Sequence, residues 1–190
     1  WWGKEAEEAE SIRAIHACLD GGMNLLDTAP VYGFGRSETI VGKAIKDRRD
    51  KVVLATKCGM IWDDTRGSFF FDLDGKKVHR SIRPDTISEE IEASLRRLGT
   101  DRIDLYQTHW PSMEPDKTPI PETMACLKDL QAQGKIRATG VSNVRRNCAA
   151  SAASSGVKIR ASRRNSAPSS VGGKPLGRAS RARARGSCSV

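Results

Sequence analysis

Two spacings of apolar residues alternate along the first three-quarters of the chain, one typical of strands and one typical of helices. Short apolar or β-branched runs predict strands at 23–27, 52–57, 103–109 and 136–141. Between these runs, apolar residues recur every three to four positions and predict amphipathic helices at about 6–19, 37–46, 86–98 and 121–133. This alternation of strand and helix favours parallel pairing, and therefore an α/β fold, either a doubly wound sheet or a (β/α)8 barrel.

Local signals refine two segments. Thr86 and Glu89 have the spacing of a helix capping box, and Gly99 follows the last apolar residue of the same predicted helix. Before this helix, we expect a long loop at about 58–84. Within it, Asp74-Gly75 separates two short runs and predicts a β-hairpin.

The pattern stops at Val144, and residues 145–190 have a different composition. They are mainly Arg, Ala, Ser, Gly and Pro without an apolar period, which predicts a disordered tail. The tail holds eleven Lys and Arg and no Asp or Glu, so the net charge of +9 for the whole chain becomes −2 for residues 1–144, with 21 basic and 23 acidic residues. We therefore expect one globular segment, 1–144, followed by a basic tail.

Composition excludes several classes of protein. No apolar run approaches the roughly 18 residues of a membrane helix, and no secretory signal is visible, so we expect a soluble cytoplasmic protein. The five cysteines are scattered and form no C-x-x-C pair, which argues against a disulfide framework or a zinc site. The chain starts with Trp1 rather than Met, and we expect Trp1-Trp2-Gly3 to be the end of a first strand whose beginning is missing.

Polar side chains lie at the carboxyl ends of the four predicted strands. In chain order they are Asp27 with Tyr32 five residues beyond it, Lys57, His109, and the pair Ser142 and Asn143. Because the carboxyl ends of parallel strands meet on one face, we expect these groups to share a pocket. Each of them has an ordinary explanation when taken alone, as a turn residue, a solvated strand end or a structural histidine, but their joint occurrence favours a functional site.

The chemistry of this set is coherent. A phenol with a pKa of about 10 is a poor acid near neutrality. A neighbouring ammonium lowers that pKa, and a carboxylate holds the ammonium in place. A neutral histidine can donate a hydrogen bond to a carbonyl oxygen. The set suits protonation of an oxygen while hydride arrives at its carbon. Gly33-Phe34-Gly35 is followed by Glu38 where a third glycine would be needed, so no dinucleotide fingerprint is present.

Several motifs together resemble the aldo-keto reductase family, in order and spacing, over residues 1–144. They are Asp27-Thr28-Ala29 with Tyr32-Gly33, Lys57, Tyr106-Gln107-Thr108-His109-Trp110, and Gly140-Val141-Ser142-Asn143. The resemblance implies an NADPH-dependent enzyme that reduces a small aldehyde or ketone on a (β/α)8 barrel. This chain would hold about the first five strands and four helices of that barrel.

The resemblance also implies a role for each site residue. Tyr32 would be the general acid, Lys57 would lower its pKa, and Asp27 would pair with Lys57 and lie at the cofactor. His109 would orient the carbonyl. Ser142 and Asn143 would bind the nicotinamide carboxamide. Trp62 and Phe69–Phe71 would form a wall of the substrate pocket. Trp1 or Trp2 would be the pocket aromatic at the end of the first strand.

The family pattern continues beyond Val144 through further strands that complete the cofactor site, and none of these is recognisable in the tail. We therefore expect this chain to show little or no NADPH-dependent activity. A shifted reading frame in a GC-rich gene is the favoured origin of the tail, because the change falls at the exit of a core strand. The alternative is a genuine basic extension that binds nucleic acid or acidic surfaces.

A second class of function stays open at this point. Some relatives, such as potassium-channel β subunits, are binding or regulatory partners rather than enzymes, and a non-functional truncated product is a further alternative. The sequence does not specify the substrate or the oligomeric state.

Overall fold

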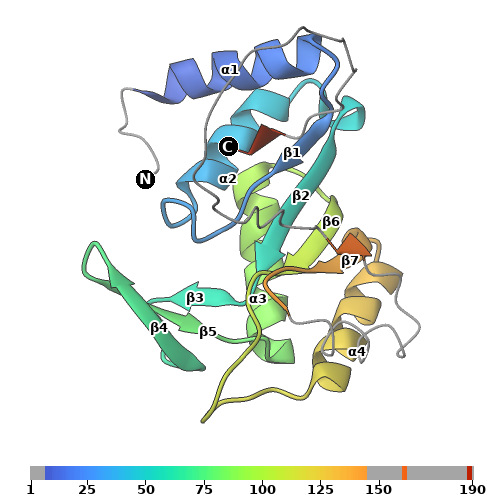
Figure 1. Cartoon of the computed structure of the whole chain (residues 1–190). Coiled ribbons are helices and arrows are strands. Elements are labelled where there is room, and N and C mark those ends of the chain that lie inside the picture. The colour runs from blue at the N-terminus through green and yellow to red at the C-terminus, as the bar shows by residue number, and fades with distance from the viewer. Residues whose placement is uncertain (1–6, 145–159, 162–187, 190) are drawn as a thin grey trace, which may run out of the picture.

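Parallel pairing joins the four predicted strands into one sheet in the computed structural model, which describes residues 7–144, 160–161 and 188–189. Strands β1 (Leu25–Asp27), β2 (Val53–Cys58), β6 (Ile103–Thr108) and β7 (Ile136–Val141) lie side by side in the order β7-β6-β2-β1. Two-residue strands continue the sheet at its edges, β8 (Arg160–Ala161) on β7 and β9 (Cys188–Ser189) on β1. The predicted parallel α/β fold is confirmed (Figure 1).

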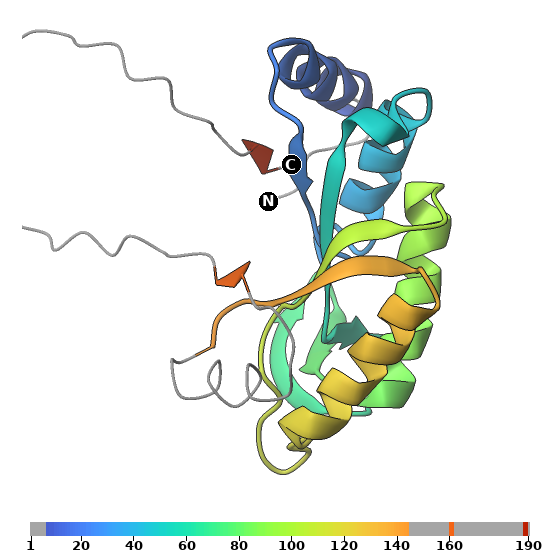
Figure 2. The same ribbon diagram turned by 90° about the vertical axis from the view of Figure 1, so that its right-hand side faces the viewer.

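Four helices alternate with these strands, and their bounds differ from the predicted ones by no more than two residues. They are α1 (Glu8–Asp20), α2 (Arg36–Ile45), α3 (Pro84–Leu98) and α4 (Ile120–Ala132), with a short 3-10 helix η2 at Arg49–Lys51. Figure 2 shows α2, α3 and α4 along the same side of the sheet. No helix in the described part of the chain is both long and apolar enough to cross a membrane.

The hydrophobic core lies between these helices and the sheet. Val41 of α2, Leu54 of β2 and Leu127 of α4 are completely buried there, as are Ile87 and Ile91 of α3. Burial of an aliphatic side chain of this size contributes about 1.5–3 kcal/mol. The apolar stripes read from the sequence are therefore the faces that hold the helices on the sheet.

The start of α3 corrects the predicted capping box. The helix begins at Pro84, and the Thr86 hydroxyl donates to the carbonyl oxygen of Arg83 at 3.0 Å instead of capping a backbone N–H. Proline favours the first helical position because its fixed φ suits the helix and its missing N–H needs no partner. At the other end the prediction is confirmed, since Gly99 ends the helix at φ 61°.

A second, antiparallel sheet replaces most of the predicted long loop. Its strands are β3 (Met60–Trp62), β4 (Ser68–Leu73) and β5 (Lys76–Arg80), in the order β3-β5-β4. The predicted hairpin is confirmed, with Asp74 at φ 52° and Gly75 at φ 75°. Two consecutive residues at positive φ match the twist of the flanking strands. Strand β3 was not predicted, because three residues are too few to show a period.

Some predictions lie outside the described residues. They are the strand end at Trp1-Trp2-Gly3 and, apart from the four residues of β8 and β9, the disordered tail. The division at residue 144 and the shifted reading frame stay predictions, and the nucleotide sequence across codons 140–190 tests the second.

Candidate active site

An ion pair between a buried lysine and a partly exposed aspartate lies where β1 and β2 end. The Lys57 ammonium donates to both carboxylate oxygens of Asp27, at 3.0 and 3.1 Å, and to the carbonyl oxygen of Thr28 at 2.8 Å. The Lys57 side chain is 6% exposed and that of Asp27 is 31% exposed. Burial lowers the pKa of Lys57 below its ordinary value, and the charges of Asp27 and Glu38 oppose that shift. Three acceptors therefore hold a cation that burial alone would disfavour.

Tyr32 and His109 complete this cluster. The Lys57 ammonium lies 5.2 Å from the centre of the Tyr32 ring, and the rings of Tyr32 and His109 meet edge to face with centroids 5.7 Å apart. The loop that carries Tyr32 is fixed by backbone hydrogen bonds from Tyr32 to Ala29 and from Ser37 to Tyr32. The structure thus brings together the four predicted residues from three strand ends and one loop.

Ser142 and Asn143 follow β7 and lie against the backbone of the neighbouring strand end. The Ser142 N–H donates to the carbonyl oxygen of Thr108 at 2.8 Å. The Asn143 amide donates to the carbonyl oxygen of His109 at 2.8 Å and to the Ser142 hydroxyl at 3.0 Å. Asn143 has φ 55°, a region that asparagine tolerates better than most residues. Both side chains stay partly exposed beside His109.

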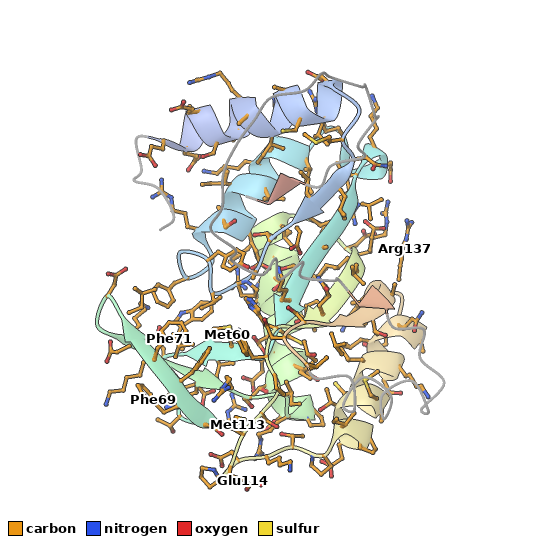
Figure 3. All side chains as sticks on the ribbon, viewed as in Figure 1. Met60, Phe69, Phe71, Met113, Glu114 and Arg137 are labelled. Atoms are coloured by element: carbon orange, nitrogen blue, oxygen red, sulfur yellow. The ribbon has the colours of Figure 1, made fainter. Side chains whose placement is uncertain are left out.

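A cavity of about 420 Å³ opens beside Tyr32 and His109, and its other walls are apolar. They are formed by Val31, Met60, Phe70, Phe71, Leu73 and Trp110. Figure 3 shows the labelled Met60 and Phe71 on the three-stranded sheet, below the parallel strands. A phenol and an imidazole are thus the polar side chains of an otherwise apolar wall, an arrangement suited to orienting one oxygen of a small molecule.

The predicted pocket wall is right for two of its four aromatic residues. Phe70 and Phe71 line the cavity, whereas Phe69 is 56% exposed and Trp62 contacts Phe34 instead. The pairing of β4 with β5 is irregular between Phe69 and Phe71, so Phe70 is an extra residue. Such a bulge breaks the two-residue alternation of a strand. No sequence signal indicated which of the three phenylalanines would face the site.

Several polar residues outside the predicted set support the site from behind. Glu38, fully buried, accepts hydrogen bonds from Thr56 at 2.7 Å and from Arg97 at 2.6 Å. Glu90 accepts from the backbone N–H of Gly59, directly after β2. Sequence reasoning missed both, because a glutamate on an amphipathic helix looks like a surface residue until its partners are known.

Two further residues, His16 and Cys58, have structural roles. The His16 ring bonds to the carbonyl oxygen of Ala44 at 2.9 Å. Cys58 is buried, and burial raises the pKa of its thiol well above the ordinary value, as expected for a packed residue rather than a reactive one. Within the described residues, no group of His, Cys, Asp and Glu is arranged to hold a metal ion.

Comparison with known proteins agrees with this geometry. The family model described as "Aldo/keto reductase family" matches residues 1–165. The chain is 48% identical over 136 residues to the NADH-specific methylglyoxal reductase of Escherichia coli, covering 71% of this chain and 40% of that protein. It is 49% identical over 144 residues to the aldo-keto reductase YhdN of Bacillus subtilis, covering 75% of this chain and 39% of that protein.

Solved structures give the same result. The glycerol dehydrogenase AKR11B4 of Gluconobacter oxydans superimposes with a TM-score of 0.68 at 45% identity, covering 80% of this chain and 44% of that one. An aldo-keto reductase of Klebsiella pneumoniae in complex with NADPH superimposes with a TM-score of 0.60 at 33% identity, covering 76% of this chain and 43% of that one. The predicted fold, part of a (β/α)8 barrel, is confirmed, and the chain spans about 40% of the length of the curated relatives it matches.

Proposed function

Since this chain belongs to the aldo/keto reductase family, we propose that its site transfers the proton in an NADPH-dependent reduction of a small aldehyde or ketone. The observation that supports this most directly is the Lys57–Asp27 pair beside the ring of Tyr32, a residue that lines a cavity together with His109.

Each residue then has one task. A carbonyl substrate enters the apolar cavity, and the His109 ring donates a hydrogen bond that orients its oxygen. As the carbonyl carbon accepts hydride, which is the chemistry that NADPH supplies when bound, the oxygen takes the proton of the Tyr32 hydroxyl. The Lys57 ammonium stabilises the phenolate that remains, and Asp27 holds that ammonium in place.

The residues after β7 fit the nicotinamide end of such a cofactor. The Asn143 amide nitrogen is already used on the carbonyl oxygen of His109. An asparagine amide oxygen is an acceptor of the kind that a carboxamide N–H2 needs. Ser142 offers a hydroxyl beside it. One relative is named NADH-specific and another was solved with NADPH. We propose NADPH, and parallel assays with both nucleotides test this preference.

A titration of the tyrosines tests the acid role without a need for turnover. The chain has two tyrosines, and burial raises the pKa of Tyr106 well above its ordinary value. The phenolate that appears first in an absorbance titration should therefore be that of Tyr32, and Tyr32→Phe should remove it. Lys57→Met should shift its midpoint upward. If the midpoint of the Tyr32 titration is the same in Lys57→Met, the ammonium does not act on this phenol.

Turnover is the second test. We expect weak or no oxidation of NADPH with methylglyoxal or glyceraldehyde, because residues 145–190 show no recognisable sequence pattern for the rest of the cofactor site. Any turnover that occurs should vanish in Tyr32→Phe and persist in Phe69→Ala, a substitution at an exposed residue outside the cavity. Turnover that survives Tyr32→Phe would overturn the proposed mechanism.

A further inference from the structure

Glu90 links helix α3 to the end of the strand that carries Lys57. It lies in the second turn of α3, and its two carboxylate oxygens are 3.1 and 2.9 Å from the backbone nitrogen of Gly59. Gly59 is the one residue between β2 and β3, and it comes two positions after Lys57. A side chain of the helix layer thus fixes the turn that follows the ion pair.

The turn at Cys58 and Gly59 is also tied to the rest of the site. The carbonyl oxygen of Cys58 accepts from the His109 N–H at 2.8 Å, and that of Gly59 accepts from Ser81 at 3.3 Å. Gly59 has φ +91°, and a Cβ there would come within 2.9 Å of the Ile82 side chain, so this conformation of the turn requires a glycine. Any shift of this turn would move Lys57 on one side and His109 on the other.

We propose that Glu90 is a positioning residue for the site. It holds the Cys58–Gly59 turn, which directly follows Lys57 and accepts the hydrogen bond from the His109 backbone N–H, and so fixes both residues relative to Tyr32. Glu90 does not line the cavity beside Tyr32, so it acts through the backbone rather than on a substrate. The proposal rests on the proposed function only for the consequence at Tyr32, since the hydrogen bond itself exists whatever the site does.

The surroundings of Glu90 define which substitution preserves this bond. Burial raises the pKa of Glu90 to about 8, with a smaller contribution from the negative charge of Glu38, while the N–H groups of Gly59 and Met60 and the charge of Arg97 oppose the shift. The nearby Cys58 and Tyr106 are neutral at pH 7, because burial raises the pKa of both. A glutamine amide keeps one acceptor oxygen at the end of a side chain of the same length, so Glu90→Gln can still accept from the Gly59 N–H.

Three variants therefore separate positioning from a general effect on folding. Glu90→Ala should speed hydrogen exchange at the Gly59 amide by at least about tenfold and shift the Tyr32 phenolate midpoint toward that of Lys57→Met. Glu90→Gln should restore both. Glu89 is the preceding residue, and its exposed side chain pairs with Arg66. Glu89→Ala should therefore change neither the exchange rate at Gly59 nor the Tyr32 midpoint.

A measurement on the unmodified chain covers the case in which Glu90→Ala does not fold. In an NMR pH titration, the Glu90 carboxyl carbon and the Gly59 amide should follow one midpoint, above the ordinary carboxyl range, and Glu90→Gln should abolish the response at Gly59. A Gly59 amide chemical shift that does not change as Glu90 titrates would overturn the proposal. A Tyr32 midpoint sensitive to Lys57→Met but not to Glu90→Ala would overturn it while the proposed function stands. A midpoint insensitive to Lys57→Met would instead refute the proposed function.

Discussion

Replacing Asp27 and replacing Lys57 should lower the free energy of unfolding by different amounts. Lys57 is nearly buried and Asp27 is about one-third exposed, with side-chain exposures of 6% and 31%. Asp27→Asn leaves a buried ammonium without its counter-ion, whereas Lys57→Met leaves a carboxylate that water still reaches. The methionine also fills the space of the lysine stem with an apolar chain. We therefore expect the aspartate substitution to destabilise the protein more.

The magnitudes follow from this geometry. Removing one partner of a fully buried pair costs about 3–5 kcal/mol. Asp27→Asn should lie near the lower end of that range, at about 3 kcal/mol, because the asparagine oxygen and the Thr28 carbonyl still accept from Lys57. Lys57→Met should cost about 1–2 kcal/mol, chiefly because the Thr28 carbonyl loses its partner. The double variant should be more stable than Asp27→Asn alone, since it no longer buries a charge.

The dependence on pH gives a second check with a definite sign. Burial lowers the pKa of Lys57 in the folded chain, so the unfolded chain holds more protons between that lowered pKa and about 10.5. The contribution of Lys57 to stability must therefore rise with pH in this window. The loss caused by Asp27→Asn should shrink as pH rises, because the buried lysine can discard its proton more easily.

Urea unfolding followed by tryptophan fluorescence and circular dichroism, at several values between about pH 6 and pH 10.5, measures these differences. Lys57→Met provides the matched control, because it removes the titrating group. A loss for Lys57→Met equal to or larger than that for Asp27→Asn would refute the reasoning. So would a loss for Asp27→Asn that grows with pH.

Two further predictions concern the packing behind the site. Gly42→Ala would place a Cβ 2.6 Å from the carbonyl oxygen of Arg97. Overpacking should cost about 1–3 kcal/mol, more than the gain in helix propensity of about 1 kcal/mol. Urea unfolding should therefore show a lower free energy of unfolding for Gly42→Ala, but not for Lys43→Ala. Leu127→Ala removes a fully buried side chain and should cost about 2–5 kcal/mol by the same assay, while a loss below 1 kcal/mol, roughly, would contradict its place in the core.

Much of the site was predictable because its residues follow strand ends. Asp27 and Lys57 lie at the carboxyl ends of β1 and β2, and His109 directly follows β6, so parallel pairing brings all three to one edge of the sheet. The positions of the helices were predictable for a similar reason, since an apolar stripe reports which face is buried. The start of α3 was misjudged because Pro84 outweighed a capping pattern two residues later.

The sequence by itself determined the parallel α/β fold of the described residues and the cluster of Asp27, Tyr32, Lys57 and His109, because hydrophobic period and strand ends are local properties of a chain. The tertiary structure decided which phenylalanines face the cavity and which glutamate holds the turn after Lys57. The first depends on an irregular pairing between β4 and β5, and the second joins residues 31 positions apart. Contacts of that kind arise only when separate elements pack, so no local pattern records them.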